Sequence, residues 1–187
     1  MENAMTVTTL KPTMLRHGAA MIGAVLLLTL SAKISVPFIP VPMTLQVAAV
    51  LALAGVFGLR LAAQGYGAYL AAGAVGLPVF AGTPAKGLGL AYMAGPTGGY
   101  LLGFLAAILL IGVARDRFGT KGAVAAMPVG LAVIYALGIA WLARFVPAGK
   151  LLELGVLPFL FGDLCKLALA ALITLGAAAL RDGGRDV

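Results

Sequence analysis

The chain has 187 residues, of which 62% are hydrophobic and only 10% are Asp, Glu, Lys or Arg, and its mean hydropathy is +1.09. Because soluble domains carry about 25% charged residues, this composition excludes an ordinary soluble protein and indicates one that lies in a membrane. The single Cys excludes a disulfide framework, and the single His argues against a histidine-based site. The net charge is +7, but the positive residues are scattered between apolar runs and not gathered on one face, which argues against nucleic-acid binding.

Charged residues divide the chain into apolar stretches, and Pro- and Gly-rich segments show where these stretches leave the helical state. A membrane-crossing helix needs about 20 apolar residues. We therefore expect six helices, at residues 15–32, 44–60, 62–77, 98–114, 122–143 and 156–180. In the fifth, Tyr135 and Trp141 fit packing and interfacial anchoring. The expected fold is an all-α integral membrane protein, one domain over residues 1–187, with a compact six-helix transmembrane bundle at 15–180 and polar tails at 1–14 and 181–187.

The positive charges predict the orientation of this bundle. With six helices both chain ends share a side with the turns near residues 60 and 115–121. Eight cations fall on that side, namely Lys11, Arg16, Arg60, Arg115, Arg117, Lys121, Arg181 and Arg185. Four fall on the other side, namely Lys33, Lys86, Arg144 and Lys150. Because cytoplasmic loops are richer in Lys and Arg, we expect cytoplasmic termini and outward-facing loops at 35–43, 79–97 and 146–155.

In the first expected helix, small residues recur at helical spacing. Ala20 and Ala24 lie four residues apart, with Gly23 beside Ala24. Such spacing permits close helix–helix approach, either within the bundle or with a partner.

The first outer loop runs into the second helix through the segment PFIPVPMTLQ at 37–46. Its prolines stiffen an apolar loop, in which Phe38 and Ile39 can cover a ligand. Thr44 and Gln46 can supply hydrogen bonds at the start of the helix. The alternative is a re-entrant turn at the membrane interface.

The run GPTGGY at 95–100 precedes the fourth helix and contains Thr97, Gly98, Gly99 and Tyr100. Its glycines allow a ligand or a second backbone to approach closely, Thr97 can cap the helix, and free N–H groups there favour an anionic or carbonyl oxygen. Tight packing at a loop-to-helix turn explains the run equally well. Lys86, in the loop before it, either attracts an anionic solute or is a solvated charge.

Asp163 and Lys166 lie inside the sixth apolar stretch. A charge near the bilayer centre costs at least about 2.5–3.5 kcal/mol, so such residues usually mark a substrate or ion pathway. Three residues apart, they share one helical face and can neutralise each other. The alternative is an ion pair that only joins helices, although buried pairs stabilise poorly compared with apolar packing.

Three motifs together resemble the BioY family, the biotin-binding substrate-capture (S) subunits of energy-coupling-factor (ECF) vitamin transporters. They are VPMTLQ at 41–46, GPTGGY at 95–100 followed by Gly103-Phe104, and Gly162-Asp163-x-x-Lys166. GLPVF at 76–80 adds to the likeness, which covers residues 15–180. The resemblance implies a six-helix subunit of a bacterial-type cell membrane, not an enzyme and without a cofactor, that captures biotin outside. Transport energy then comes from ATP-binding cassette ATPases joined through a transmembrane coupling subunit.

The resemblance also implies roles for single residues. Asp163 suits the N–H edge of the ureido ring of biotin, and Lys166 suits the ureido carbonyl or neutralises Asp163. Phe38, Ile39, Leu45 and Tyr100 are expected along the apolar part. Backbone N–H groups near Thr97–Gly99, or Lys86, are candidates for the carboxylate. The alanines Ala20 and Ala24 correspond to the partner-docking surface.

Two other functions remain open at this point. One is capture of another vitamin by the same class of transporter. The other is an ion-coupled secondary transporter in which Asp163 and Lys166 form a relay.

Overall fold

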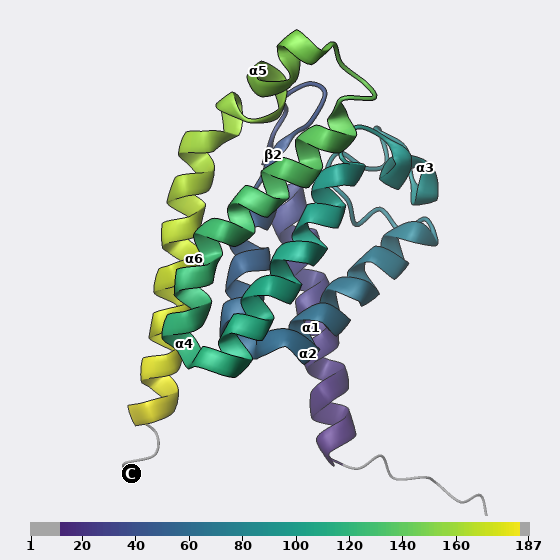
Figure 1. Cartoon of the computed structure of the whole chain (residues 1–187). Coiled ribbons are helices and arrows are strands. Elements are labelled where there is room, and N and C mark those ends of the chain that lie inside the picture. Colours follow the sequence, from purple (N-terminus) through teal and green to yellow (C-terminus); the bar gives the residue numbers. More distant parts are fainter. Residues whose placement is uncertain (1–11, 184–187) are drawn as a thin grey trace, which may run out of the picture.

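The computed structural model describes residues 12–183, and these form a bundle made almost entirely of helices (Figure 1). The elements in chain order are α1 (Pro12–Lys33), β1 (Ser35–Val36), β2 (Met43–Thr44), α2 (Gln46–Ala74), α3 (Gly89–Ala94), α4 (Gly98–Leu142), the 3-10 turn η1 (Ala148–Lys150), α5 (Leu151–Gly155) and α6 (Leu157–Gly183). Lys11, Arg185 and most of the predicted tails lie outside the described residues.

Helix α2 reverses direction at Gly58. An unbroken helix would hold Gln46 and Tyr69 about 35 Å apart, at 1.5 Å per residue. Instead the Gln46 side-chain amide donates to the Tyr69 hydroxyl over 2.8 Å. The reversal occurs where Gly58 adopts φ 77° and ψ −173°, a left-handed φ that glycine accepts without strain.

At the Gly58 turn, two charged side chains bind backbone groups at the ends of the two helix halves. Asp116 of α4 accepts a hydrogen bond from the Leu59 N–H over 3.3 Å. Arg181 of α6 donates to the Val56 carbonyl over 3.0 Å. Because unpaired N–H and C=O groups at helix ends need partners, these contacts join three helices at this turn.

Helix α4 is likewise a hairpin of two antiparallel halves, and it turns at Gly119, where φ is 69° (Figure 1). Glycines allow the halves to touch backbone to backbone. A Cβ added to Gly103 would lie 2.8 Å from the Ile134 Cα, and one added to Gly130 would lie 2.8 Å from the Ile111 side chain. Such close approach through small residues is typical of helices in membranes.

Among the residues that the structure describes, three helical stretches are long and apolar enough to cross a membrane, namely Gln46–Ala74, Gly98–Leu142 and Ala148–Arg181. In the first, 67% of the most apolar window is buried within the bundle, against 33% and 17% in the other two. Helix α2 is therefore the central element, and the other two expose apolar side chains as a lipid-facing surface does.

The helices predicted from the sequence correspond to observed segments. Residues 15–32 lie in α1 and 156–180 overlap α6, while the other four predicted helices overlap the two halves of α2 and of α4. The short elements α3, η1 and α5 were not predicted. The segment 35–44 is not helical, as its prolines predicted. Ser35 pairs with Thr44 and Val36 with Met43 in a short antiparallel ribbon, and the residues between them form the turn.

The short elements gather at one end of the bundle, opposite the described chain ends. Figure 1 shows β2, α3 and α5 at this end, whereas α1 begins and α6 ends at the other. The loops that the sequence assigned to the outer side therefore lie together.

Candidate functional site

A cavity lies among these loops and the adjoining ends of the long helices. It contains about 540 Å³ of empty space, including the part open to solvent. The residues that line it come from the 41–44 segment, α2, α3, α4, α6, the loop before α3 and the turn before α4. They are Val41, Pro42, Met43, Thr44, Gln46, Val47, Ala81, Tyr92, Thr97, Tyr100, Leu101, Phe104, Ile134, Tyr135, Phe159 and Asp163.

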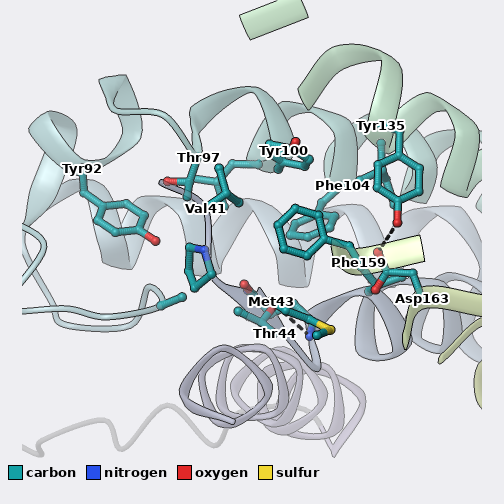
Figure 2. Close-up of a pocket in the computed structure, with 16 residues that line it drawn as sticks. Val41, Met43, Thr44, Tyr92, Thr97, Tyr100, Phe104, Tyr135, Phe159 and Asp163 are labelled. Atoms are coloured by element: carbon teal, nitrogen blue, oxygen red, sulfur yellow. Dashed lines mark hydrogen bonds between the residues drawn. The ribbon is translucent and has the colours of Figure 1, made fainter. Parts of the chain in front are cut away.

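Asp163 is the one charged residue among those lining residues, and it is only 4% exposed. Lys166 donates to its Oδ1 over 2.7 Å, as expected for residues one helical turn apart. The Tyr135 hydroxyl donates to its Oδ2, also over 2.7 Å (Figure 2). Both carboxylate oxygens are thus held, from α6 and from α4, while the group still faces the cavity. Lys166 lies behind the carboxylate and does not line the cavity.

Aromatic side chains form the walls between the two ends of the cavity. Figure 2 shows Phe104 and Phe159 between the Tyr135–Asp163 pair at one end and Tyr92 and Thr97 at the other. Such a cavity suits a ligand with an apolar middle and polar ends.

The predicted site residue Tyr100 lines the cavity with its ring. Its hydroxyl donates to the Gly155 carbonyl over 2.7 Å and so fixes the ring against the segment before α6. Phe38 does not line the cavity. It packs edge-on against Phe159, with ring centroids 5.9 Å apart, and supports the wall from behind.

Thr44 and Gln46 both line the cavity, as predicted. The Thr44 hydroxyl accepts the Gln46 backbone N–H over 3.3 Å. The Gln46 amide donates to Tyr69, whose hydroxyl donates to the Val79 carbonyl over 3.3 Å. This chain of bonds fixes the start of α2 to the loop that follows its second half.

The GPTGGY run divides into two roles. Thr97 lines the cavity, and contrary to the expected cap its side chain makes no capping hydrogen bond to α4. Gly98 and Gly99 do not line the cavity. A Cβ on Gly98 would meet the Met93 carbonyl, and one on Gly99 would lie 2.5 Å from the Leu137 carbonyl. Tight packing therefore explains these two glycines here.

Three other residues named from the sequence do not line the cavity. Ile39 is 82% exposed at the tip of its loop and Leu45 faces elsewhere, so neither forms the apolar wall. Lys86 is exposed, away from the lining. No group of His, Cys, Asp and Glu side chains within residues 12–183 is placed to hold a metal ion.

Sequence reasoning missed several lining residues. Tyr135 was assigned to packing and anchoring, but its hydroxyl binds Asp163. Tyr92, Phe104 and Phe159 were not singled out, although Phe104 falls inside a quoted motif. A tyrosine or phenylalanine in an apolar helix carries no local signal that distinguishes a cavity wall from lipid contact.

Lys33 has a structural role that its place in the charge count did not indicate. Its amine donates to the Phe80 and Thr83 carbonyls over 2.9 and 3.0 Å and to the Thr83 hydroxyl over 2.9 Å. All three of its N–H bonds are thus used to hold the loop that places Ala81 in the cavity wall.

Ala20 and Ala24 differ in accessibility. Ala24 is 3% exposed, and its Cβ lies 2.6 Å from where a Gly65 Cβ would stand, so it packs α1 against α2. It is therefore not available to a partner in this conformation, whereas Ala20 is half-buried.

Comparison with known proteins gives matches over most of the chain. The BioY family pattern matches residues 2–182. A Pyrococcus horikoshii protein named as a probable biotin transporter BioY is 42% identical over 149 residues, 80% of this chain and 88% of that one. The Thermotoga maritima biotin transporter BioY is 42% identical over 151 residues, with the same coverage.

A solved structure has the same fold. It is the S-component for biotin from an ECF-type ABC transporter, with a TM-score of 0.76 and 24% sequence identity over 93% of this chain and 95% of that one. With 42% identity to curated members and a family match over nearly its whole length, the chain belongs to the BioY family.

Proposed function

We propose that this chain is the high-affinity biotin-binding membrane subunit of an ECF-type vitamin uptake transporter. The observation that carries the proposal is the cavity with one buried, doubly held carboxylate at one end and aromatic walls beyond it. Family membership and the names of the relatives support biotin as the solute.

The chemistry of the cavity suits the parts of biotin. The ureido ring has two N–H donors, and a carboxylate oxygen has lone pairs left after accepting one hydrogen bond. Asp163 therefore accepts from the ureido edge while Tyr135 and Lys166 hold it in place. Phe104, Phe159 and Tyr100 contact the apolar ring and chain.

The helix halves suggest six membrane crossings, by α1, the two halves of α2, the two halves of α4, and α6. A single helix of 45 residues would span about 68 Å, more than twice a bilayer core of about 30 Å, so α4 must cross twice. The bias of Lys and Arg toward the end with Arg60 and Arg181 then puts both termini in the cytoplasm and the cavity outside.

Energy for uptake comes, in this proposal, from separate ATP-binding cassette ATPases through a transmembrane coupling subunit. No phosphate-binding loop ending in Gly-Lys-Ser/Thr occurs in the sequence. We assign docking of the coupling subunit to the accessible face of α1 that includes Ala20.

Calorimetry of the purified chain with biotin tests the proposal. We expect tight binding, weakened at least tenfold by Asp163→Asn, because the amide offers one acceptor oxygen and adds donors that face the ureido N–H groups. The matched control is Asp116→Asn, the same change at the opposite end of the bundle, which keeps an acceptor for Leu59 and should leave affinity unchanged. Titration with a panel of other vitamins shows whether biotin or another vitamin binds most tightly. Tighter binding of another vitamin, or none of biotin, would refute the assignment.

A further inference from the structure

The end of the cavity opposite Asp163 carries two hydroxyls with no assigned role, those of Tyr92 and Thr97. Figure 2 places both at this end, with the aromatic walls between them and Asp163. Neither hydroxyl donates to or accepts from any other described residue outside this pair. In particular, the Thr97 hydroxyl is not used to cap α4.

Tyr92 is positioned firmly. Its side chain is 6% exposed, and its ring stacks on Phe80 with centroids 4.9 Å apart and planes 14° apart. Burial raises the pKa of its phenol, and the neighbouring Thr97 side chain lowers it by less. The phenol is therefore protonated at neutral pH and acts as an O–H donor.

Charge restricts where an anionic ligand group can lie. The Asp163 carboxylate, paired with Lys166, offers a second carboxylate acceptor oxygens and no donor, and it is the one charged group among the described residues that line the cavity. Lys33, in the nearby loop contacts, uses all three N–H bonds on Phe80 and Thr83. The ligand carboxylate at this end therefore contacts hydroxyl donors, and no Lys or Arg is among the lining residues.

Resting on the proposed function, we infer that the Tyr92 and Thr97 hydroxyls bind the carboxylate of biotin, so that recognition of this end of the ligand needs no positive charge. Hydrogen bonds to an ionised acceptor are roughly twice as strong as neutral ones, whereas losing one partner of a buried ion pair costs more. The cavity therefore accepts biotin whose carboxylate is replaced by a neutral carboxamide, which keeps a carbonyl acceptor for both hydroxyls.

The test is calorimetry of the full-length chain in detergent with biotin and with biotinamide. In the wild-type protein we expect biotinamide to bind within about tenfold of biotin. Tyr92→Phe and Thr97→Val should each weaken biotin binding about tenfold, a fold-change in line with one hydrogen bond to a charged group. Thr97→Ser, which keeps the hydroxyl, should retain wild-type affinity.

A matched control removes a hydroxyl elsewhere. Thr29→Val loses a bond to the Val25 carbonyl, and neither Thr29 nor Val25 lines the cavity, so biotin affinity should not change. Wild-type affinity in a Tyr92→Phe/Thr97→Val double variant, or more than a tenfold loss with biotinamide in the wild type, overturns the inference while leaving biotin binding intact. Absence of biotin binding in the wild type instead refutes the proposed function, and the inference with it.

Discussion

The Asp163 carboxylate is almost buried and is held by two side chains. Lys166 and Tyr135 each donate to one of its oxygens over 2.7 Å, on a residue that is 4% exposed. Replacing a buried ion pair with apolar side chains is often neutral or stabilising. The chain therefore retains a polar cluster for which binding, and not folding, gives the better explanation.

A variant series at Asp163 and Lys166 separates these roles. Lys166→Met leaves the carboxylate without its cation and should lower the free energy of unfolding by about 3–5 kcal/mol. Asp163→Leu/Lys166→Met removes both charges and should recover most of that loss, yet bind biotin at least tenfold more weakly than the wild type. Thermal unfolding in detergent and calorimetry provide the two measurements. A double variant with wild-type affinity would show that the pair only stabilises the bundle.

Residues with a charge in an apolar stretch could be found from the sequence, but their partners could not. Asp163 and Lys166 can be recognised without knowing how their helix packs, because charged residues are rare in an apolar stretch. Tyr135 binds Asp163 from 28 positions away, so only the packing of α4 on α6 identifies it. Lys86 and Lys33 could not be distinguished from the sequence, because both lie in or next to outer loops. In the structure, only Lys33 is held by the loop beside the cavity.

Among the elements, the α4 hairpin depends most directly on glycine. Gly103 and Gly138 lie where the two halves touch, and a Cβ on Gly138 would enter the Tyr100 ring, itself part of the cavity wall. The packing of this hairpin thus positions one wall of the site.

We predict that Gly103→Ala destabilises the protein. Its Cβ would lie 2.8 Å from the Ile134 Cα and 3.0 Å from the Ile134 carbonyl oxygen, and backbone atoms cannot move aside. Overpacking of this kind costs about 1–3 kcal/mol, which lowers the melting temperature by about 3–10 °C. Gly176→Ala in α6 is the matched control, since nothing lies within 4 Å of its added Cβ. Equal melting temperatures for the two variants in detergent would contradict the tight hairpin.

Helix positions followed from the sequence because charged residues interrupt the apolar stretches close to the turns. Breaks predicted near residues 60 and 115–121 occur at Gly58 and Gly119. The role of Gly98 and Gly99 did not follow, since a glycine that admits a ligand and one that admits a neighbouring helix look alike in sequence. Only the positions of Leu137 and Met93 distinguish the two cases.

The molecule as a whole has two different ends. The cavity and the loops around it lie at one, while the Gly58 turn, with Asp116 and Arg181, lies at the other, near the ends of α1 and α6 (Figure 1). Between them α1 exposes Ile22, Leu26 and Leu30, at 63%, 56% and 63%. A partner that binds α1 would touch the subunit along its length without occupying the cavity.

Arginine substitutions along α1 test this arrangement. Ala20 is half-buried and nothing lies within 4 Å of a Cβ added to Gly23, so Ala20→Arg and Gly23→Arg should keep biotin binding in detergent. Both should abolish ATP-driven uptake in vesicles that contain the complete transporter, because a charged side chain prevents close helix approach. Ala24→Arg, by contrast, would force a cation between α1 and Gly65 and should yield little folded protein. Normal uptake by both Ala20→Arg and Gly23→Arg would place the coupling subunit on another face of the bundle.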